Sequence, residues 1–388
     1  SINDDGLPGI FRGIASLGGP SEIKRIFEPS FHSSPASQAA AWAALINSES
    51  NKKPEGDIDL ILQAALTQPV DSMRVQSLEL IAKWKISELK NSISALAFNQ
   101  TASDLTRLAA IRALGKLEGV DTKKLIHIVN NKESKILQLA GLESISRLNL
   151  SEAAKLGADM ITKGNSDDEL LYIFLNRESG SKALMKALGK SNLNKTSAAK
   201  ILAKLQSIGC SDTNLLSYLS KVAEIKNTVP TYSMEYISDL VKASSKGNAS
   251  NGKLIFSTAG CVACHQIESS NNNGIPFIGP DLETIGNTLS PERIIEEVIW
   301  PSRHVKEGYN LLQVTTNDGD VYQGYEQRTR EKNVILRPLS QARTITIPQE
   351  EIREQSQLGS AMPTGLTSNL SMKHLADLIR YLSEKGQN

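Results

Sequence analysis

The chain has 388 residues, and its 43 Lys and Arg residues against 42 Asp and Glu residues leave a net charge of +1. So small a charge provides no overall attraction to nucleic acid or to an anionic membrane. No stretch approaches the roughly 18 consecutive apolar residues that a membrane-spanning helix needs, so we expect no transmembrane segment. The length predicts at least two domains, and only three cysteines exclude a disulfide scaffold.

The first 240 residues are predicted to form a helical-repeat domain. Apolar residues recur three and four positions apart over residues 21–220, and strand-like runs are few. Similar segments begin at Arg74, Arg107 and Gln138, which are 33 and 31 residues apart. One shared position of the three copies carries a small residue: Ser77, Ala110 and Gly141. Small residues let paired helices approach closely, so the pattern resembles a HEAT-like α-solenoid.

A different composition begins after this region. Residues 241–251 are polar and lack an apolar period, which predicts a linker before a second domain of residues 252–388. Three helices are expected here: a short one that Asn248 can cap, one that starts at Ser290-Pro291, and a last one that begins near Ser371. The fold class is therefore mainly α.

Between the second and third of these helices, a β insertion is expected over about residues 311–350. Short runs of alternating β-branched and aromatic residues begin near Leu312, Val321, Val334 and Thr344. Asp318-Gly319 between the first two runs is typical of a hairpin turn. The insertion is predicted to be a small antiparallel meander.

Cys261, Cys264 and His265, in the sequence Cys-Val-Ala-Cys-His, follow the spacing of a c-type haem attachment site. Two thiols three positions apart reach both vinyl groups of a haem, and the adjacent imidazole reaches the iron. The alternatives are half of a zinc site or a redox-active cysteine pair. A zinc site needs further ligands and a redox pair usually lies in a βαβ pattern, and the sequence indicates neither.

Met362 is the predicted second axial ligand of the iron. It lies in an irregular Gly-Ser-Ala-Met-Pro-Thr-Gly segment just before the final helix, where a sulfur atom can face a metal. The rival ligands are His304 and His374. Ligation by His and Met raises the reduction potential and closes the iron to other ligands, which favours electron transfer over substrate chemistry.

Gly279-Pro280 follows the cysteine motif after a short loop. The Pro280 carbonyl could accept the Nδ1 proton of His265 and so orient the ring, as metal-bound histidines generally require. A simple Gly-Pro turn explains the same residues equally well.

Together these features resemble the cytochrome c family, to which Gly252, Phe256 and Tyr381 of the flanking helices add further matches. More narrowly, the β insertion is similar to that of a haem-binding domain first described in planctomycetes and verrucomicrobia, often found behind helical repeats. The resemblance implies one haem c held by Cys261 and Cys264, His265 as proximal and Met362 as distal ligand, and Pro280 orienting His265. It also implies that Phe256 packs near Tyr381. Longer members carry a dehydrogenase-like β-propeller, for which this sequence shows no repeat.

The resulting expectation is a mono-haem c-type cytochrome that accepts single electrons from a dehydrogenase of the sugar or alcohol type and passes them to a respiratory acceptor. Covalent haem attachment indicates export, so a periplasmic or other extracytoplasmic location is expected. The alternatives are a helical-repeat scaffold with a structural or redox-sensing haem, and a haem peroxidase, which needs an open sixth position. No catalytic residue and no nucleic-acid surface is predicted, and whether the chain is part of a larger enzyme stays open.

Overall fold

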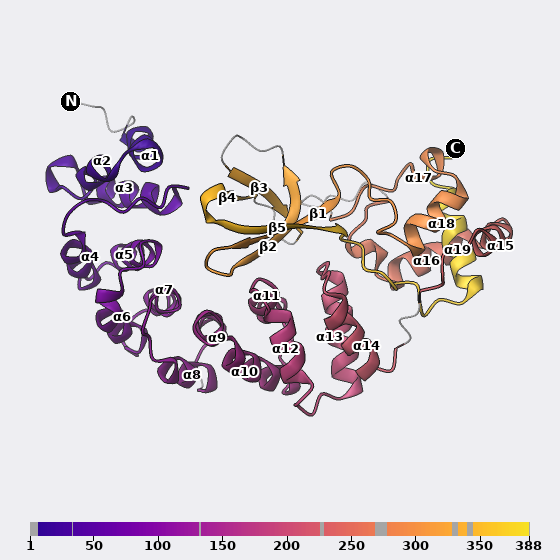
Figure 1. Ribbon diagram of the computed structural model, residues 1–388, viewed down its shortest axis with the longest axis horizontal. Coiled ribbons are helices and arrows are strands. Elements are labelled where there is room, and N and C mark those ends of the chain that lie inside the picture. The colour runs from indigo at the N-terminus through magenta and orange to yellow at the C-terminus, as the bar shows by residue number, and fades with distance from the viewer. Residues whose placement is uncertain are drawn as a thin grey trace. The chain divides into compact units, whose positions relative to one another are not determined.

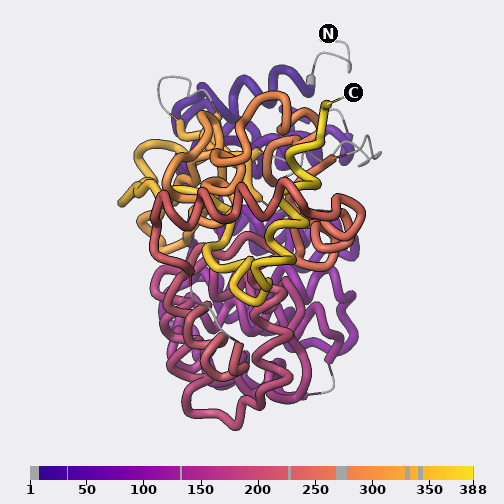
Figure 2. The backbone as a smooth tube through the Cα atoms, turned by 90° about the vertical axis from the view of Figure 1, so that its right-hand side faces the viewer, coloured from indigo at the N-terminus to yellow at the C-terminus, as the bar shows by residue number. Residues whose placement is uncertain are grey.

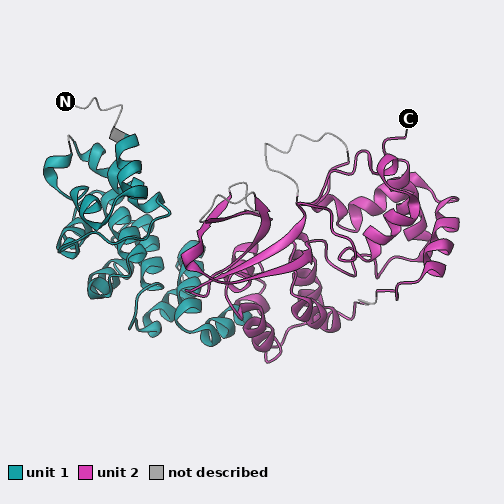
Figure 3. Ribbon diagram, turned by 45° about the horizontal axis from the view of Figure 1, so that its top comes forward, with its two compact units in different colours: residues 1–159 teal, residues 160–388 magenta. Residues whose placement is uncertain are grey.

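The computed structural model describes residues 7–32, 34–131, 133–225, 229–267, 278–327, 333–339 and 344–387. The chain divides into two compact units, Ser1–Asp159 and Met160–Asn388 (Figure 3). It is mainly helical, with one small antiparallel sheet, as the sequence predicts. Among the described residues, no helix has both the length and the apolar character needed to span a bilayer.

The first unit is built of helices, most of them arranged as neighbouring pairs. Its elements are α1 (Leu7–Leu17), α2 (Pro20–Arg25), η2 (Pro29–Phe31), α3 (Pro35–Asn47), α4 (Ile58–Leu66), α5 (Asp71–Lys83), η3 (Ser87–Leu89), α6 (Lys90–Ala97), α7 (Asp104–Leu114), α8 (Thr122–Asn130) and α9 (Lys135–Leu148), with α10 (Leu150–Thr162) crossing the boundary. Contacts run from α3 to α5, from α5 to α7 and from α7 to α9. In addition, α4 packs on α5, α6 on α7 and α8 on α9.

Two of the small residues at the shared repeat position lie where paired helices meet. The Ser77 hydroxyl on α5 donates to the Leu62 carbonyl of α4 at 2.8 Å. On α9, a Cβ at Gly141 would lie 3.1 Å from Val129 of α8, tighter than an ordinary contact. Small residues at these positions therefore permit the close packing within each pair, as the sequence predicts.

The second unit contains the cysteine motif, further helices and the sheet, and Figure 1 labels these helices and strands. Its helices are α11 (Asp168–Leu175), α12 (Gly180–Leu188), α13 (Lys195–Ser207), α14 (Thr213–Val222), α15 (Met234–Ser244), α16 (Ala249–Thr258), η4 (Cys261–Ala263), α17 (Ile285–Thr288), α18 (Pro291–Ile299) and α19 (Met372–Ser383). The predicted cap at Asn248 is present, and α18 and α19 begin directly after Ser290 and Ser371, close to the predicted starts. Each of the three side chains accepts a hydrogen bond from a backbone N–H of its helix.

The stretch interpreted as a linker, residues 241–251, is mostly helical. Its first residues are the last turn of α15 and its last residues are the first turn of α16, with a short turn between them. Helix α15 packs on α19, and its buried Ile237 and Leu240 belong to the core around that helix. The helices of residues 1–240 are thus divided between the two units, and the predicted boundaries of independently folding domains stay a prediction.

The sheet has five antiparallel strands in the order β4-β3-β2-β1-β5. The strands are β1 (Asn310–Thr316), β2 (Val321–Gln327), β3 (Asn333–Pro338), β4 (Ile345–Pro348) and β5 (Ile352–Ser360), with η5 (Gln349–Glu351) before the last. The predicted meander corresponds to β1–β4. The sheet extends beyond residue 350 because the chain returns after η5, and β5 pairs with the free edge of β1.

The sheet is attached to the helices before it through the β1–β2 turn. The Arg177 guanidinium, between α11 and α12, donates to the Asp318 carbonyl at 2.8 Å and to the Asp320 carboxylate at 2.9 Å. The Glu178 N–H donates to the Gly319 carbonyl at 2.9 Å. The hairpin turn predicted at Asp318-Gly319 is therefore also a docking point within the unit.

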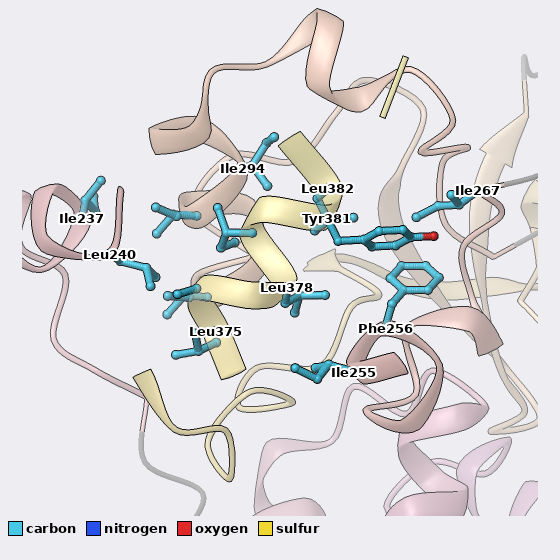
Figure 4. Packing of buried hydrophobic residues seen from close by; sticks show 14 residues of the cluster. Ile237, Leu240, Ile255, Phe256, Ile267, Ile294, Leu375, Leu378, Tyr381 and Leu382 are labelled. Atoms are coloured by element: carbon cyan, nitrogen blue, oxygen red, sulfur yellow. The ribbon is translucent and has the colours of Figure 1, made fainter. Parts of the chain in front are cut away.

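Helix α19 lies at the centre of a second core, formed with α15, α16 and α18 (Figure 4). Figure 2 shows α19, in yellow, beside the segments of α15 and α16. The rings of Phe256 on α16 and Tyr381 on α19 lie 5.9 Å apart, as the resemblance implies. Gly252 makes this crossing close, because a Cβ there would lie 2.1 Å from the Asp377 carbonyl oxygen of α19.

A buried carboxylate also joins α16 and α19. Asp377 is 2% exposed and accepts from the Asn248 N–H at 2.7 Å, from the Asn251 amide at 2.6 Å and from Lys373 Nζ at 2.9 Å. Burial alone would raise the pKa of Asp377, but these hydrogen bonds outweigh it and lower the pKa from 3.8 to about 2. The ionised carboxylate therefore stabilises the start of α16.

Asp377→Asn is expected to destabilise the α16–α19 contact by about 2 kcal/mol at pH 7. Because the folded pKa of Asp377 lies below its ordinary value, this stabilisation is present above pH 4 and is lost as the pH falls toward 2. Hydrogen exchange of the α16 and α19 amides in a urea series at pH 7 and pH 3 measures the difference. Lys373→Met is the control, with a smaller effect because the Lys373 side chain is 76% exposed. An equal loss at both pH values would contradict the assignment.

Candidate haem attachment site

The two thiols and the imidazole lie in one tight turn after α16. Gly260 adopts φ +87°, which favours glycine, and ends the helical course of the chain. The 3₁₀ turn Cys261–Ala263 follows, and the Cys261 carbonyl accepts from the N–H groups of Cys264 at 3.2 Å and His265 at 3.0 Å. Local hydrogen bonds thus hold the three predicted haem-binding residues together.

The His265 ring is held by the segment at Gly279. Its Nδ1 lies 2.8 Å from the Pro280 carbonyl oxygen, so the hydrogen bond predicted from the sequence is present. Since a carbonyl oxygen only accepts, Nδ1 carries the proton and the Nε2 lone pair is left to act as a ligand. Burial lowers the pKa of His265 and the bond to Pro280 opposes this, so the ring is neutral at pH 7.

Gly279 lies directly against the imidazole. A Cβ at this position would lie 2.4 Å from Cε1 and 2.7 Å from Nδ1 of His265. The Gly279 N–H donates to the Cys264 carbonyl at 2.8 Å, which ties this segment to the cysteine turn. Absence of a side chain at Gly279 is therefore required for the observed ring position.

Cys261 and Cys264 are free, half-buried thiols. Burial raises the pKa of Cys261 to about 11 and also raises that of Cys264. A redox-active cysteine pair depends on a lowered thiol pKa, so these values argue against that alternative. In the parts of the chain that the structure describes, no three His, Cys, Asp or Glu side chains are grouped so as to bind a metal ion.

Met362 follows β5 and is half-buried, and its N–H donates to the Ser360 hydroxyl at 3.1 Å. The preceding residue, Ala361, is buried in a cluster whose margin includes Ile278. Ile278 precedes Gly279, which contacts the His265 ring, so the Met362 segment and the imidazole segment approach each other. The rivals His304 and His374 are both exposed.

The sheet adds a residue to the site that the sequence did not indicate. Tyr325 of β2 is 2% exposed, lies in the same cluster as Ala361, and makes an edge contact with Tyr309 at 5.3 Å. Burial is the main cause that raises the pKa of Tyr325, and the Cys264 thiol is close enough to contribute. Alternation along β2 predicts an inward Tyr325, but it does not show which segment that face meets.

The residues present fit a covalently attached haem in their chemistry. Two thiols and one oriented imidazole leave the same turn, and a thioether follows on a segment that approaches it. In comparisons with known proteins, neither a family model nor a curated protein matches this chain.

Proposed function

We propose that this chain is a mono-haem c-type cytochrome that transfers single electrons. The observation that carries the proposal is the imidazole of His265, fixed through Nδ1 by the Pro280 carbonyl in the same turn as two free thiols. A proton fixed on Nδ1 leaves the Nε2 lone pair available to a metal, which is what a metal-binding histidine requires. Haem, when bound, supplies a one-electron couple.

In this proposal, Cys261 and Cys264 would hold the haem through thioether bonds, and His265 and Met362 would be the two protein ligands of its iron. Burial keeps the thiols protonated before attachment. The neutral imidazole needs to lose no proton in order to bind iron. Residues 252–388 would then form a cytochrome c-type domain with a β insertion, and the helices of residues 1–240 a HEAT-like solenoid.

The partners proposed here are those that the family resemblance implies. A dehydrogenase of the sugar or alcohol type would donate electrons, a respiratory acceptor would receive them, and the helical repeats would provide a docking surface. Covalent attachment of haem would indicate a periplasmic or other extracytoplasmic location.

Visible spectra of the chain produced with a c-type maturation system test the proposal. We expect covalently retained haem, sharp reduced bands, and a far-red sulfur-to-iron band that Met362→Ala abolishes. Met372→Ala is the matched control, since Met372 is an exposed methionine in the first turn of α19.

Two outcomes would contradict the proposal. If the purified protein lacks haem, or if its haem can be extracted, Cys261 and Cys264 do not form an attachment site. A high-spin spectrum that shifts with carbon monoxide or cyanide would exclude Met362 as ligand and favour a sensor or a peroxidase.

A further inference from the structure

The loop that follows Met362 lies against α13 and α14. Between them is a small cavity of about 90 Å³, lined by Gly365 and Leu366 on the loop side. Ala199 and Leu202 of α13 and Ser220 of α14 line the opposite side. The loop therefore faces helices that lie about 150 residues earlier in the sequence across this small cavity.

The connection between Leu366 and Met362 is short and stiff. Pro363 follows Met362 directly, is buried, and has a restricted φ. Gly365 adopts φ +88°, a conformation that side chains disfavour, and it sets the turn that directs Leu366 to α13. Because the backbone between them is restricted, a shift of Leu366 also moves Met362.

The chain before Met362 is tied to the same group of helices. Strand β5 pairs with β1, whose turn to β2 is held by Arg177 through the 2.9 Å ion pair with Asp320. Near the end of α13, a Cβ at Gly209 would lie 2.7 Å from Leu339, which follows β3. Helices α11–α14 therefore contact the sheet that leads into Met362 and line one cavity with the loop that leaves it.

We propose that α13 and α14 position Met362 and that Leu366 is the positioning residue through which they act. This inference rests on the proposed function, in which the Met362 sulfur is an axial ligand. It assigns α11–α14 a role in the ligation of the iron in addition to any role as a docking surface. Displacement of α13 weakens the sulfur ligation and lowers the reduction potential.

Two variants test the inference from opposite sides of the cavity. Leu366→Ala enlarges the cavity on the loop side, and Ala199→Asp places a carboxylate on its α13 side without changing the loop. Leu366→Met keeps most of the volume and should retain wild-type behaviour. Leu193→Ala is the matched control, because Leu193 is also half-buried but lies before α13 and away from the cavity.

The readouts are the amplitude of the far-red sulfur-to-iron band as the pH is raised, and the midpoint potential. Both disruptive variants are expected to weaken ligation about tenfold, which lowers the pH at which the band is half lost by about one unit for a one-proton replacement. The potential should fall in parallel, and circular dichroism should show unchanged helix content.

The possible results separate the two proposals. A normal band in wild type that neither variant changes would overturn the role of α13 and leave the proposed function intact. An equal effect of Leu193→Ala would overturn it as well, since general destabilisation would then explain the result. If the wild-type protein has attached haem but lacks the sulfur-to-iron band, Met362 is not a ligand of the iron. The inference about α13 and Leu366 would then be wrong as well. Faster hydrogen exchange of residues 364–370 in haem-free Ala199→Asp would support the contact independently of haem.

Discussion

Gly252→Ala is expected to separate α16 from α19 and to destabilise the C-terminal core by about 3 kcal/mol. The added Cβ would lie 2.1 Å from the Asp377 carbonyl oxygen and 2.6 Å from Tyr381 Cβ. Neither atom can move by a change of rotamer, so one helix must shift as a whole. Faster hydrogen exchange of the α16 and α19 amides measures this effect.

Gly13→Ala in α1 provides the control for this substitution. Gly13 is also helical, but nothing lies within 4 Å of a Cβ built there. Alanine is the better helix former, so Gly13→Ala should be neutral or stabilise α1 by up to about 1 kcal/mol. If Gly252→Ala were tolerated equally well, the close crossing of α16 and α19 would be wrong.

Gly279→Ala is expected to displace the His265 ring and to break the hydrogen bond from Nδ1 to Pro280. The new Cβ would overlap Cε1 and Nδ1 of the ring, while the backbone that carries it is tied to Cys264. In the haem-free chain, imidazole nitrogen shifts in NMR should change from one Nδ1–H tautomer to a mixture. The His265 pKa, lowered chiefly by burial in the wild type, should move back toward its ordinary value as the ring becomes exposed.

With haem attached, Gly279→Ala should weaken His265 ligation by about 10- to 100-fold, the usual effect of losing a partner that orients a metal ligand. Pro280→Ala is the control, because it retains the main-chain carbonyl that accepts the Nδ1 proton. A wild-type tautomer in Gly279→Ala would show that the ring does not depend on this contact. A mixed tautomer in Pro280→Ala would show that the proline ring, and not the carbonyl alone, holds the segment in place.

Much of the candidate site follows from residues close together in the sequence. The cysteine spacing determines that two thiols and His265 share a turn, and Gly260 accounts for the backbone conformation that begins it. Helix ends were also predictable, because a cap such as Ser290 satisfies backbone N–H groups within its own first turn. The sequence allowed two interpretations of Gly279-Pro280, a hydrogen bond to His265 or a simple turn. The structure contains the hydrogen bond.

Strand β5 could not be predicted from its own sequence. Its sequence, Ile-Arg-Glu-Gln-Ser-Gln-Leu-Gly-Ser, lacks the apolar alternation that predicts a strand, and most of its central residues are exposed. It forms because β1 has a free edge, and its register shifts twice along that edge. A polar strand at a sheet edge is determined by its partner and not by its own composition.

The sequence by itself determined the mainly helical class, the strands of the meander, the helix caps and the cysteine turn, because each depends on hydrogen bonds or periodicity within a few residues. Only the tertiary structure decided that Tyr325 lies near Cys264 and that Gly279 contacts the His265 ring. It also decided that residues 241–251 are largely helical and that α13 and α14 face the loop after Met362. These contacts join segments that are far apart in the chain or depend on packing with them. These contacts form because the surfaces involved are buried from water against each other. A pattern within a short stretch of sequence does not show which distant surface a segment will pack against.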